Sequence, residues 1–468
     1  MSSVENSTEK TPEFSIGAVK VRRNFLVRLT LVLIGGAFLD GYILGIIGPA
    51  TSPIQDDLKV NDLWIGLIAA GTLFGIFVGA PLGGWLTDRY GRKPMFLADM
   101  GLFVVASSLQ FFVALGPFAG AVGAVQLFIV RLMMGIAIGG EYSIGFPLMT
   151  EFAPARLRGR LLGSTLVGWW VGFMVAFIVA HVLMGVAVDW RIIIGTSTVI
   201  AVVVFLARIG LPESPRWLIQ QGRYQEALAV ANEYMDPQET EALIRESEGV
   251  SEKPAANGTF AMLFNRHNWR ATLFTAGFWF CAVTPFYAIA TFADDVLHQY
   301  GMGSGLASGV GLSALACLGG LVTALLLDKV GRRVLTVPTQ WLCTALLAVI
   351  ALWGGMPAWA VLTMFLIYSF VSASFASLTQ VYPGEVFPTE VRGIGTGFAA
   401  AFSRIGAGMG TFLLPWSIAH LGMSTSMVVA AAIAFVGAAL SQWLAPETAG
   451  RTLAVTSNSL ADTAAETH

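Results

Sequence analysis

Long apolar segments, each bounded by charged residues, proline or glycine, follow one another along this chain. Each is long enough to cross the hydrocarbon core of a bilayer, which takes roughly 20 apolar residues in a helix. The pattern predicts an all-α integral membrane protein. Its twelve predicted transmembrane helices lie at residues 25–48, 64–86, 95–114, 121–149, 161–184, 191–210, 271–293, 305–327, 334–354, 357–381, 394–415 and 425–444.

A long polar segment, about 211–270, separates the sixth predicted helix from the seventh. Apolar residues recur among charged ones in its first part, which predicts a surface helix lying against the bundle. The segment divides the chain into two halves of six helices each. The predicted order is a cytoplasmic tail over 1–24, a first bundle over 25–210, a central loop over 211–270, a second bundle over 271–445 and a tail over 446–468.

Basic residues are distributed unevenly over the predicted connections. If both termini are cytoplasmic, the outer connections hold only Lys59 and Arg191, and the inner ones hold a large excess of arginine and lysine. Such residues are retained on the cytoplasmic side of a membrane. We therefore predict a multi-pass protein of the cell membrane, here a bacterial inner membrane, with both termini in the cytoplasm.

The composition excludes several classes of protein. Hydrophobic residues make up 55% of the chain and charged residues only 12%, against about 25% in a soluble domain. A soluble fold and a disordered chain are thereby ruled out, and the continuous apolar runs differ from the alternating segments of a membrane β-barrel. The net charge of −2 indicates no nucleic-acid partner. The sequence has no Walker motif, nucleophile–histidine pair or metal-ligand spacing, so we predict neither enzyme activity nor a metal or cofactor.

Two charged loop motifs occur once in each half with the same spacing. Residues 88–93 (Asp-Arg-Tyr-Gly-Arg-Lys) after the second helix match 328–333 (Asp-Lys-Val-Gly-Arg-Arg) after the eighth. Residues 151–159, which begin with Glu and end with Arg-Gly, match 385–393 after the tenth helix. The repeats predict two pseudo-symmetric six-helix bundles, an architecture found in transporters.

These motifs resemble those of the major facilitator superfamily, and the resemblance covers almost the whole chain. Residues 84–93 are similar to its loop 2–3 signature and 131–140 to its helix 4 motif. Residues 211–218 and 446–448 resemble marks of the sugar-porter branch and its metabolite:proton relatives. The resemblance implies the superfamily fold, alternating access and a gating role for charged loop residues that form ion pairs between helices. These gating residues are Asp88, Arg89, Arg92, Glu151, Arg158, Asp328, Arg332, Glu385 and Arg392.

Two departures from the sugar porters bear on the substrate. The seventh helix lacks their glutamine-rich motif, and Gln380 stands where many of them have a cavity tryptophan. The segment around Asp40 and the position of Arg404 look most like the aromatic-acid:proton symporters, although their second helix 1 aspartate is Ile43 here. A hexose site is therefore not favoured.

Four charged residues stand out within the predicted spans, namely Asp40, Arg131, Glu141 and Arg404. A charge in the middle of a membrane costs at least about 2.5–3.5 kcal/mol and so needs a partner or a wet cavity. We predict Asp40 as the proton-coupling group with Arg131 as its partner, because helices 1 and 4 line the cavity in the resembled family. A static ion pair is the alternative. Glu141 lies about three helical turns after Arg131 and is a second proton site, a gate partner for a basic residue, or a hydrogen-bonded packing residue.

Arg404 is the residue that indicates the chemical class of the substrate. Small residues flank it, which predicts space beside it, and its planar guanidinium suits a carboxylate. We predict that Arg404 binds the carboxylate of a monovalent organic acid, with Gln380, Trp279 and Tyr287 completing the site. The alternative is a structural pair with an acid of helix 7 or 10.

The predicted function is proton-coupled uptake of a small organic anion, such as an aromatic or other monocarboxylate. Its partners are the solute, protons and the lipid bilayer, and a monomer is expected. One alternative is a sugar or polyol symporter. Another is a non-transporting receptor, which would be expected to carry a sizeable soluble output domain that this chain lacks room for in its tails and central segment.

Overall fold

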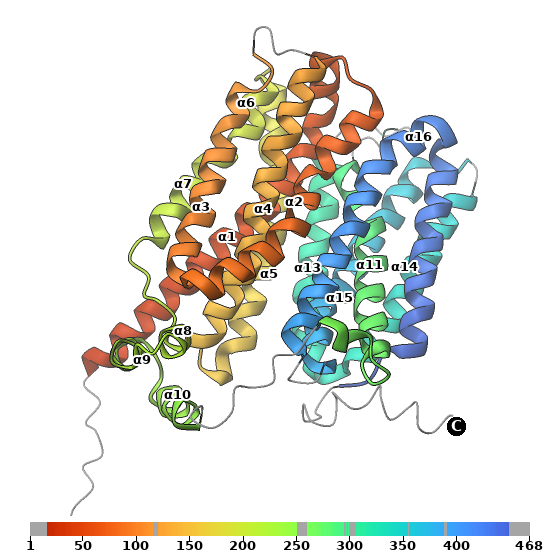
Figure 1. Cartoon of the computed structure of the whole chain (residues 1–468). Coiled ribbons are helices and arrows are strands. Elements are labelled where there is room, and N and C mark those ends of the chain that lie inside the picture. The colour runs from red at the N-terminus through yellow and green to blue at the C-terminus, as the bar shows by residue number, and fades with distance from the viewer. Residues whose placement is uncertain are drawn as a thin grey trace, which may run out of the picture.

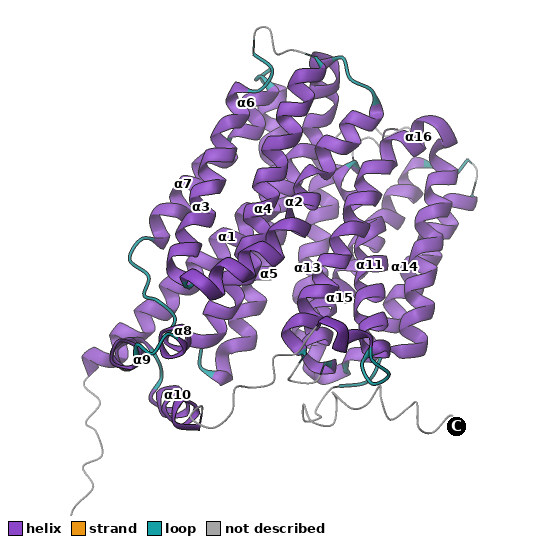
Figure 2. Ribbon diagram, in the orientation of Figure 1, coloured by secondary structure: helices purple, strands orange, loops and turns teal. Residues whose placement is uncertain are grey.

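The computed structural model describes residues 16–115, 120–249, 260–293, 296, 298, 306–353, 355–387 and 391–448. Every regular element within these residues is a helix (Figure 2). The all-α prediction is thereby confirmed.

The first bundle begins with three long helices that follow the predicted spans closely. Its elements are α1 (Ile16–Leu58), α2 (Asp62–Tyr90), α3 (Arg92–Leu109), η1 (Gln110–Phe112), α4 (Ala121–Phe152), α5 (Ala155–Gly185), α6 (Trp190–Gly195) and α7 (Ser197–Arg208). The sixth predicted span is thus divided into two helices. The break falls at Thr196. The Thr196 and Tyr42 hydroxyls are hydrogen-bonded to each other at 2.6 Å, which joins this break to α1.

The second bundle contains one helix that covers two predicted spans. Its elements are α11 (Trp269–Thr291), α13 (Leu306–Val330), α14 (Arg332–Leu352), α15 (Ala358–Val386) and α16 (Arg392–Leu444). Within α16, Gly422 has φ 82° and ψ 164°, a conformation that glycine adopts readily and that ends one span and starts the next. Ten described helices are apolar and long enough to cross a membrane, and α16 counts once among them although it makes two spans. With the shorter apolar stretch Val310–Thr323 in α13, the twelve-helix architecture follows.

Three short helices, α8 (Pro215–Gln220), α9 (Tyr224–Tyr234) and α10 (Pro237–Gly249), occupy the central segment, followed by η3 (Phe260–Phe264). They lie beneath one end of the first bundle (Figure 1). The Tyr234 ring of α9 packs 4.5 Å from that of Phe25 in α1, which in turn packs 4.9 Å from Phe152 of α4. The surface helices of this segment therefore share a small apolar core with α1, α3 and α4.

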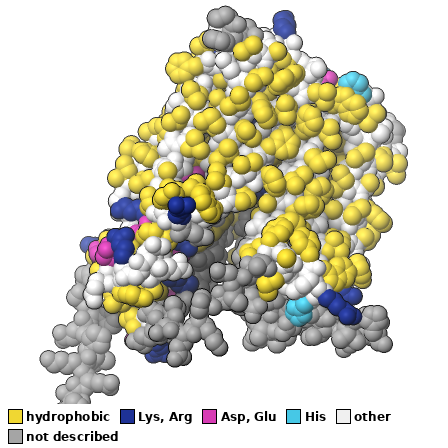
Figure 3. All heavy atoms as spheres, in the orientation of Figure 1, with side chains coloured by type: hydrophobic (Ala, Val, Ile, Leu, Met, Phe, Trp, Pro, Cys, Tyr) yellow, Lys and Arg dark blue, Asp and Glu magenta, His cyan; other side chains and the backbone are white. Residues whose placement is uncertain are grey.

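The two bundles stand side by side (Figure 1). We call the end that carries α8–α10 the motif end and the opposite one the far end. Toward the far end the backbones touch: a Cβ at Gly48 of α1 would collide with the Thr291 carbonyl, and one at Gly66 of α2 with the Phe412 carbonyl. At the motif end the surface is recessed between the bundles, and apolar side chains cover the helical wall above (Figure 3). The bundles are thus held together in their middle and far parts.

Candidate functional site

A buried cluster of charges lies in the first bundle around Arg208 of α7. Its Nη2 is 2.6 Å from Glu141 Oε1 of α4, and its Nη1 is 3.3 Å from Asp99 Oδ2 of α3. The guanidinium also donates to the Phe96 carbonyl at 3.1 Å and stacks 3.7 Å above the Phe96 ring. The Arg208 side chain is completely buried. One cation thus serves two carboxylates.

Asp40 of α1 lies next to this cluster. A Cβ at Gly36 would come 2.7 Å from Arg208 Nη2 and would collide with Glu141 Oε1, so α1 runs directly against the pair. Asp40 is one helical turn further on the same face. It is fully buried, and neither carboxylate oxygen has a hydrogen-bond partner among the described residues. The groups that act on it electrostatically are Glu141, Asp99, Arg208 and Arg404.

The predicted ion pair between Asp40 and Arg131 is not formed in this structure. Arg131 is buried, but its Nε donates to the Ile68 carbonyl at 3.0 Å and its Nη2 to the Ile43 carbonyl at 3.4 Å. A buried guanidinium needs several acceptors, and backbone oxygens of α2 and α1 provide two of them here, whereas Nη1 has no hydrogen-bond partner among the described residues. Arg131 therefore ties α4 to two neighbouring helices instead of facing the carboxyl.

Sequence reasoning missed Arg208, although one signal for it was present. It is the last residue of α7 and the only basic residue between Arg191 and Gly210, an otherwise apolar stretch. Of the alternatives left open for Glu141, a basic partner is the one that the contacts support.

Replacing Arg208 by methionine is expected to lower the free energy of unfolding by about 3–5 kcal/mol, because Glu141 and Asp99 are left buried and unpaired. Thermal unfolding of the purified protein measures this. The loss should be smaller at acidic pH, where protonation neutralises the unpaired carboxylates. A matched control is Arg223→Met, which breaks an exposed pair with Glu226 and should leave the midpoint unchanged. Equal midpoints for the two variants would contradict a stabilising role for the cluster.

Arg404 of α16 lies where the two bundles meet. Its Nη1 donates to the Tyr287 hydroxyl of α11 at 3.2 Å. Its Cζ is 5.7 Å from the ring centroid of Tyr142, which comes from α4 of the first bundle. A guanidinium has five N–H donors, and no described acid forms an ion pair with this one. The structural pair considered for Arg404 is therefore absent among the described residues.

Aromatic rings pack beside Tyr287, the hydrogen-bond partner of Arg404. The Trp169 ring of α5 is 6.3 Å from Tyr287 and nearly perpendicular to it, and Trp170 is 5.4 Å from Phe286. Trp279 is buried two turns away along α11, and no contact among the described residues joins it to Arg404. The Gln380 side chain lies outside the described residues.

The small residues beside Arg404 do not leave space, as the sequence had suggested. A Cβ at Gly406 would lie 2.7 Å from the Phe280 ring, and one at Gly408 would lie 2.6 Å from the Phe74 ring. These glycines let α16 pack closely against α11 and α2. Close packing of the backbone therefore fixes the position of Arg404.

The loop charges form ion pairs between helices at the motif end, each within one bundle. Arg92 of α3 is 2.9 Å from Glu151 of α4, and Arg332 of α14 is 3.3 Å from Glu385 of α15. Arg89 lies over the Trp85 ring at 5.7 Å. Four further predicted gating side chains lie outside the described residues, namely Asp88, Arg158, Asp328 and Arg392.

Burial raises the pKa of the Glu151 carboxyl, and Arg92 beside it opposes the shift. A raised carboxyl pKa means that the charged form is the one disfavoured by folding. The Arg92–Glu151 pair should therefore weaken, as pH falls, earlier than a pair made by an ordinary glutamate.

Two glutamates that the sequence analysis did not single out cap the helices that follow the repeated loops. Glu213 accepts hydrogen bonds from the backbone N–H of Arg92 at 2.9 Å and of Lys93 at 3.2 Å. Glu447 does the same for Arg332 and Arg333, both at 3.0 Å. The signal was present, because both glutamates belong to the motifs at 211–218 and 446–448.

The residues around each cap match as well. Gly91 and Gly331, which precede the capped helices, both have φ 99°, a value that favours glycine. The hydroxyl after each glutamate binds the acid of the neighbouring ion pair, Ser214 with Glu151 and Thr448 with Glu385. The sequence repeat is thus also a repeat of contacts.

Changing Glu213 or Glu447 to glutamine is expected to destabilise the protein by about 0.3–1 kcal/mol each, because the charge at the helix N-terminus is lost while the shape is kept. Thermal unfolding measures the effect, with Glu226→Gln as the control on an exposed helix. Because the two caps are far apart in sequence and in different bundles, the double variant should show the sum of the two losses. Loss in one variant but none in the other would contradict equivalent caps.

The chain matches the family model described as "Sugar (and other) transporter" over residues 29–459. It is 36% identical to the Escherichia coli protein YaaU over 427 residues, which are 91% of this chain and 93% of YaaU. It is 33% identical to the E. coli inner membrane metabolite transport protein YgcS over 437 residues, which are 93% and 94% of the two chains. A structure of the proton:xylose symporter XylE superposes with a TM-score of 0.77 at 19% identity, covering 92% of this chain and 98% of that one. At that identity the structural likeness is one of fold.

Proposed function

This chain belongs to the sugar (and other) transporter family of major facilitator transporters, which are not enzymes, and on that premise we propose that it takes up a small organic anion together with a proton. Arg404, at the junction of the two bundles, binds the carboxylate of the solute. The buried carboxyl of Asp40 binds the proton. The bundles rock about the bound solute to expose it alternately on the two sides of the membrane.

The observation that carries the anion assignment is the environment of Arg404. Its guanidinium contacts the Tyr287 hydroxyl and no described acid. The residue is nevertheless buried, with only 8% of its surface exposed, at the junction of the two bundles. A buried cation without a counter-ion is costly, and a solute carboxylate removes that cost with two parallel hydrogen bonds. The rings of Tyr142 and Tyr287 beside it suit a flat, partly apolar solute.

The charge balance around Asp40 supports the proton assignment. Three buried carboxyls, those of Asp40, Glu141 and Asp99, outnumber the two cations that act on them, the guanidiniums of Arg208 and Arg404. Full ionisation would leave uncompensated negative charge in a buried site, and a proton on one carboxyl removes part of it. Asp40 is the carboxyl without a hydrogen-bond partner among the described residues, so we place the exchangeable proton there.

Arg404 links the two ligands, because it acts electrostatically on Asp40. An anion bound to Arg404 cancels its positive field and so favours the protonated form of Asp40. By linkage, a proton on Asp40 favours the anion to the same extent. Solute and proton therefore bind together, as symport requires.

The orientation that we propose places the motif end, with its caps and basic residues, in the cytoplasm. The close backbone contacts near Gly48 and Gly66 then close the outer side, and the recess at the motif end opens inward (Figure 3). The loop ion pairs Arg92–Glu151 and Arg332–Glu385 bias the equilibrium between the two arrangements.

A neutral sugar or polyol is the second candidate substrate. The family description and the fold shared with a proton:xylose symporter favour it. Proteoliposomes with an imposed pH gradient distinguish the candidates when unlabelled aromatic acids, aliphatic acids, sugars and polyols compete for uptake of labelled solutes. Competition by monocarboxylates and not by sugars is expected. Competition by sugars alone would refute the anion assignment, and absence of any gradient-driven flux would refute the transport mechanism.

A further inference from the structure

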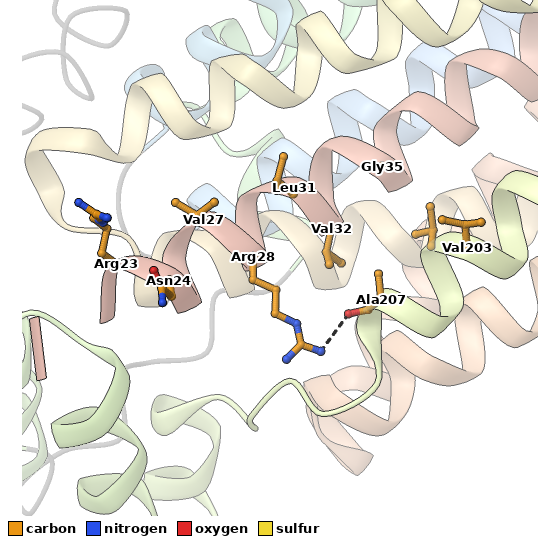
Figure 4. A pocket seen from close by; sticks show the side chains of 10 residues that line it. Arg23, Asn24, Val27, Arg28, Leu31, Val32, Gly35, Val203 and Ala207 are labelled. Carbon is orange, nitrogen blue, oxygen red and sulfur yellow. Dashed lines mark hydrogen bonds between the residues drawn. The ribbon is translucent and has the colours of Figure 1, made fainter. Parts of the chain in front are cut away.

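A groove of about 690 Å³ lies on the outer face of the first bundle, between α1 and α7 near the motif end. Figure 4 shows it from close by, with side chains of both helices along it. This volume falls within the range that holds drug-sized ligands. The groove is separate from the site around Arg404, because its lining residues all belong to α1 and α7.

The walls of the groove are apolar and exposed. The exposed fractions of Val27, Leu31 and Val203 are 52%, 62% and 61%. The groove runs along α1 from Arg23 to Gly35, which at 1.5 Å per residue is about 18 Å. This length is close to half of the roughly 30 Å hydrocarbon core of a bilayer. It matches the reach of one acyl chain within a single leaflet.

The end of the groove nearest the motif end is basic. Arg23 and Arg28 stand there with Asn24, and no acidic residue lines the groove. Arg28 is fixed in place, because its Nη2 donates to the Ala207 carbonyl at 3.2 Å (Figure 4). It also donates to the Ile209 carbonyl at 2.5 Å. Arg23 is exposed and forms no ion pair with any described residue. Figure 4 shows Arg23 and Arg28 extending to opposite sides of α1, with Arg28 turned toward α7. Arg23 is therefore the guanidinium available at this end to a phosphate that carries a hydrocarbon chain, and Arg28 adds to the positive charge.

We propose that this groove binds an anionic phospholipid, with one acyl chain lying between α1 and α7 and the phosphate on Arg23 at the basic end of the groove. In the orientation given above, the lipid comes from the cytoplasmic leaflet. Anionic headgroups in that leaflet are attracted to juxtamembrane basic residues.

The bound chain touches the part of α1 that packs against the charge cluster. Gly35 lines the inner end of the groove, and a Cβ there would lie 3.2 Å from Val204 Cγ2. The next residue, Gly36, faces the Glu141–Arg208 pair, and Arg208 follows Val204 by one turn of α7. A lipid in the groove therefore stabilises the α1–α7 contact on which the cluster depends.

Native mass spectrometry of the full-length protein tests the proposal without a transport assay. Phosphatidylglycerol and phosphatidylethanolamine with identical acyl chains are titrated separately, and retained adducts are counted. Phosphatidylglycerol is expected to bind the wild type more tightly. Arg23→Ala should weaken its binding about fivefold, and Val27→Trp, which fills the groove from an exposed position, should weaken both lipids.

The control variant is Arg266→Ala, an exposed arginine outside the groove, which should bind as the wild type does. Equal affinity of Arg23→Ala and Arg266→Ala would overturn the proposal, and so would equal retention of the two lipids by the wild type. Displacement of the lipid by inorganic phosphate alone would also overturn it, because it would show an anion site without an acyl chain. Melting temperatures confirm that each variant is folded.

Discussion

Proteoliposomes containing the Asp40→Asn variant should show no uphill accumulation of solute when a pH gradient is imposed. Asparagine keeps the size of the side chain and cannot exchange a proton, so proton movement no longer drives solute movement. Exchange of labelled for unlabelled solute at equal concentrations should continue, since the amide resembles the protonated carboxyl. The measurement is initial uptake and final accumulation with and without the gradient.

A control for this result is available on the same helix. Asp57 lies near the far end of α1, is 46% exposed and pairs with Arg191 at 2.7 Å. The Asp57→Asn variant should accumulate solute as the wild type does. If Asp40→Asn also accumulates solute fully, Asp40 is not the coupling group, and Glu141→Gln then becomes the next variant to test.

Truncation of Arg404 is expected to remove high-affinity uptake of the anion. A charge-assisted hydrogen bond contributes about 1.5–3 kcal/mol, so loss of a bidentate pair should raise KM at least about a hundredfold in Arg404→Ala. Arg404→Lys should fall between this variant and the wild type, because lysine keeps the charge without the planar fork. Tyr287→Phe removes the observed acceptor of Arg404 and should change KM only a few-fold.

The pH dependence of solute binding separates a substrate role for Arg404 from a packing role. Acidification should tighten anion binding in the wild type, because protonated Asp40 and anion at Arg404 favour each other. This dependence should vanish in Asp40→Asn, whereas a merely structural Arg404 would not show it. Normal affinity for the anion in Arg404→Ala would contradict the anion site, and unaltered uptake of a neutral solute in that variant would support the sugar alternative.

The local sequence was sufficient to predict the transmembrane helices, because a span depends on the hydrophobicity and length of its own segment. The apolar windows locate α1–α5, α11 and α13–α15, and the repeated loops indicate the two bundles. What the windows did not indicate was the break at Thr196, since it occurs inside an apolar run where hydropathy changes little. The break within α16 was indicated, because Gly422 falls in the gap between the predicted spans 394–415 and 425–444.

The intramembrane charges show the limit of the same reasoning. Asp40, Glu141 and Arg404 stood out because a charge is rare in an apolar window, and all three lie in the central contacts described here. The partners of these charges could not be predicted from the sequence, because pairing depends on which faces of packed helices meet. Arg131 was assigned to Asp40, whereas it bonds to backbone oxygens and Arg208 holds the carboxylates.

By itself, then, the sequence determined the fold class, the twofold repeat and the residues that carry charge into the membrane. The length of an apolar segment and the spacing of a motif are local properties that the sequence contains directly. The tertiary structure decided how Arg208 joins Glu141 and Asp99, how Glu213 and Glu447 cap α3 and α14, and how α1 and α7 form a groove. Each of these contacts joins residues from different helices, and close packing of glycine-bearing faces sets the distances between them.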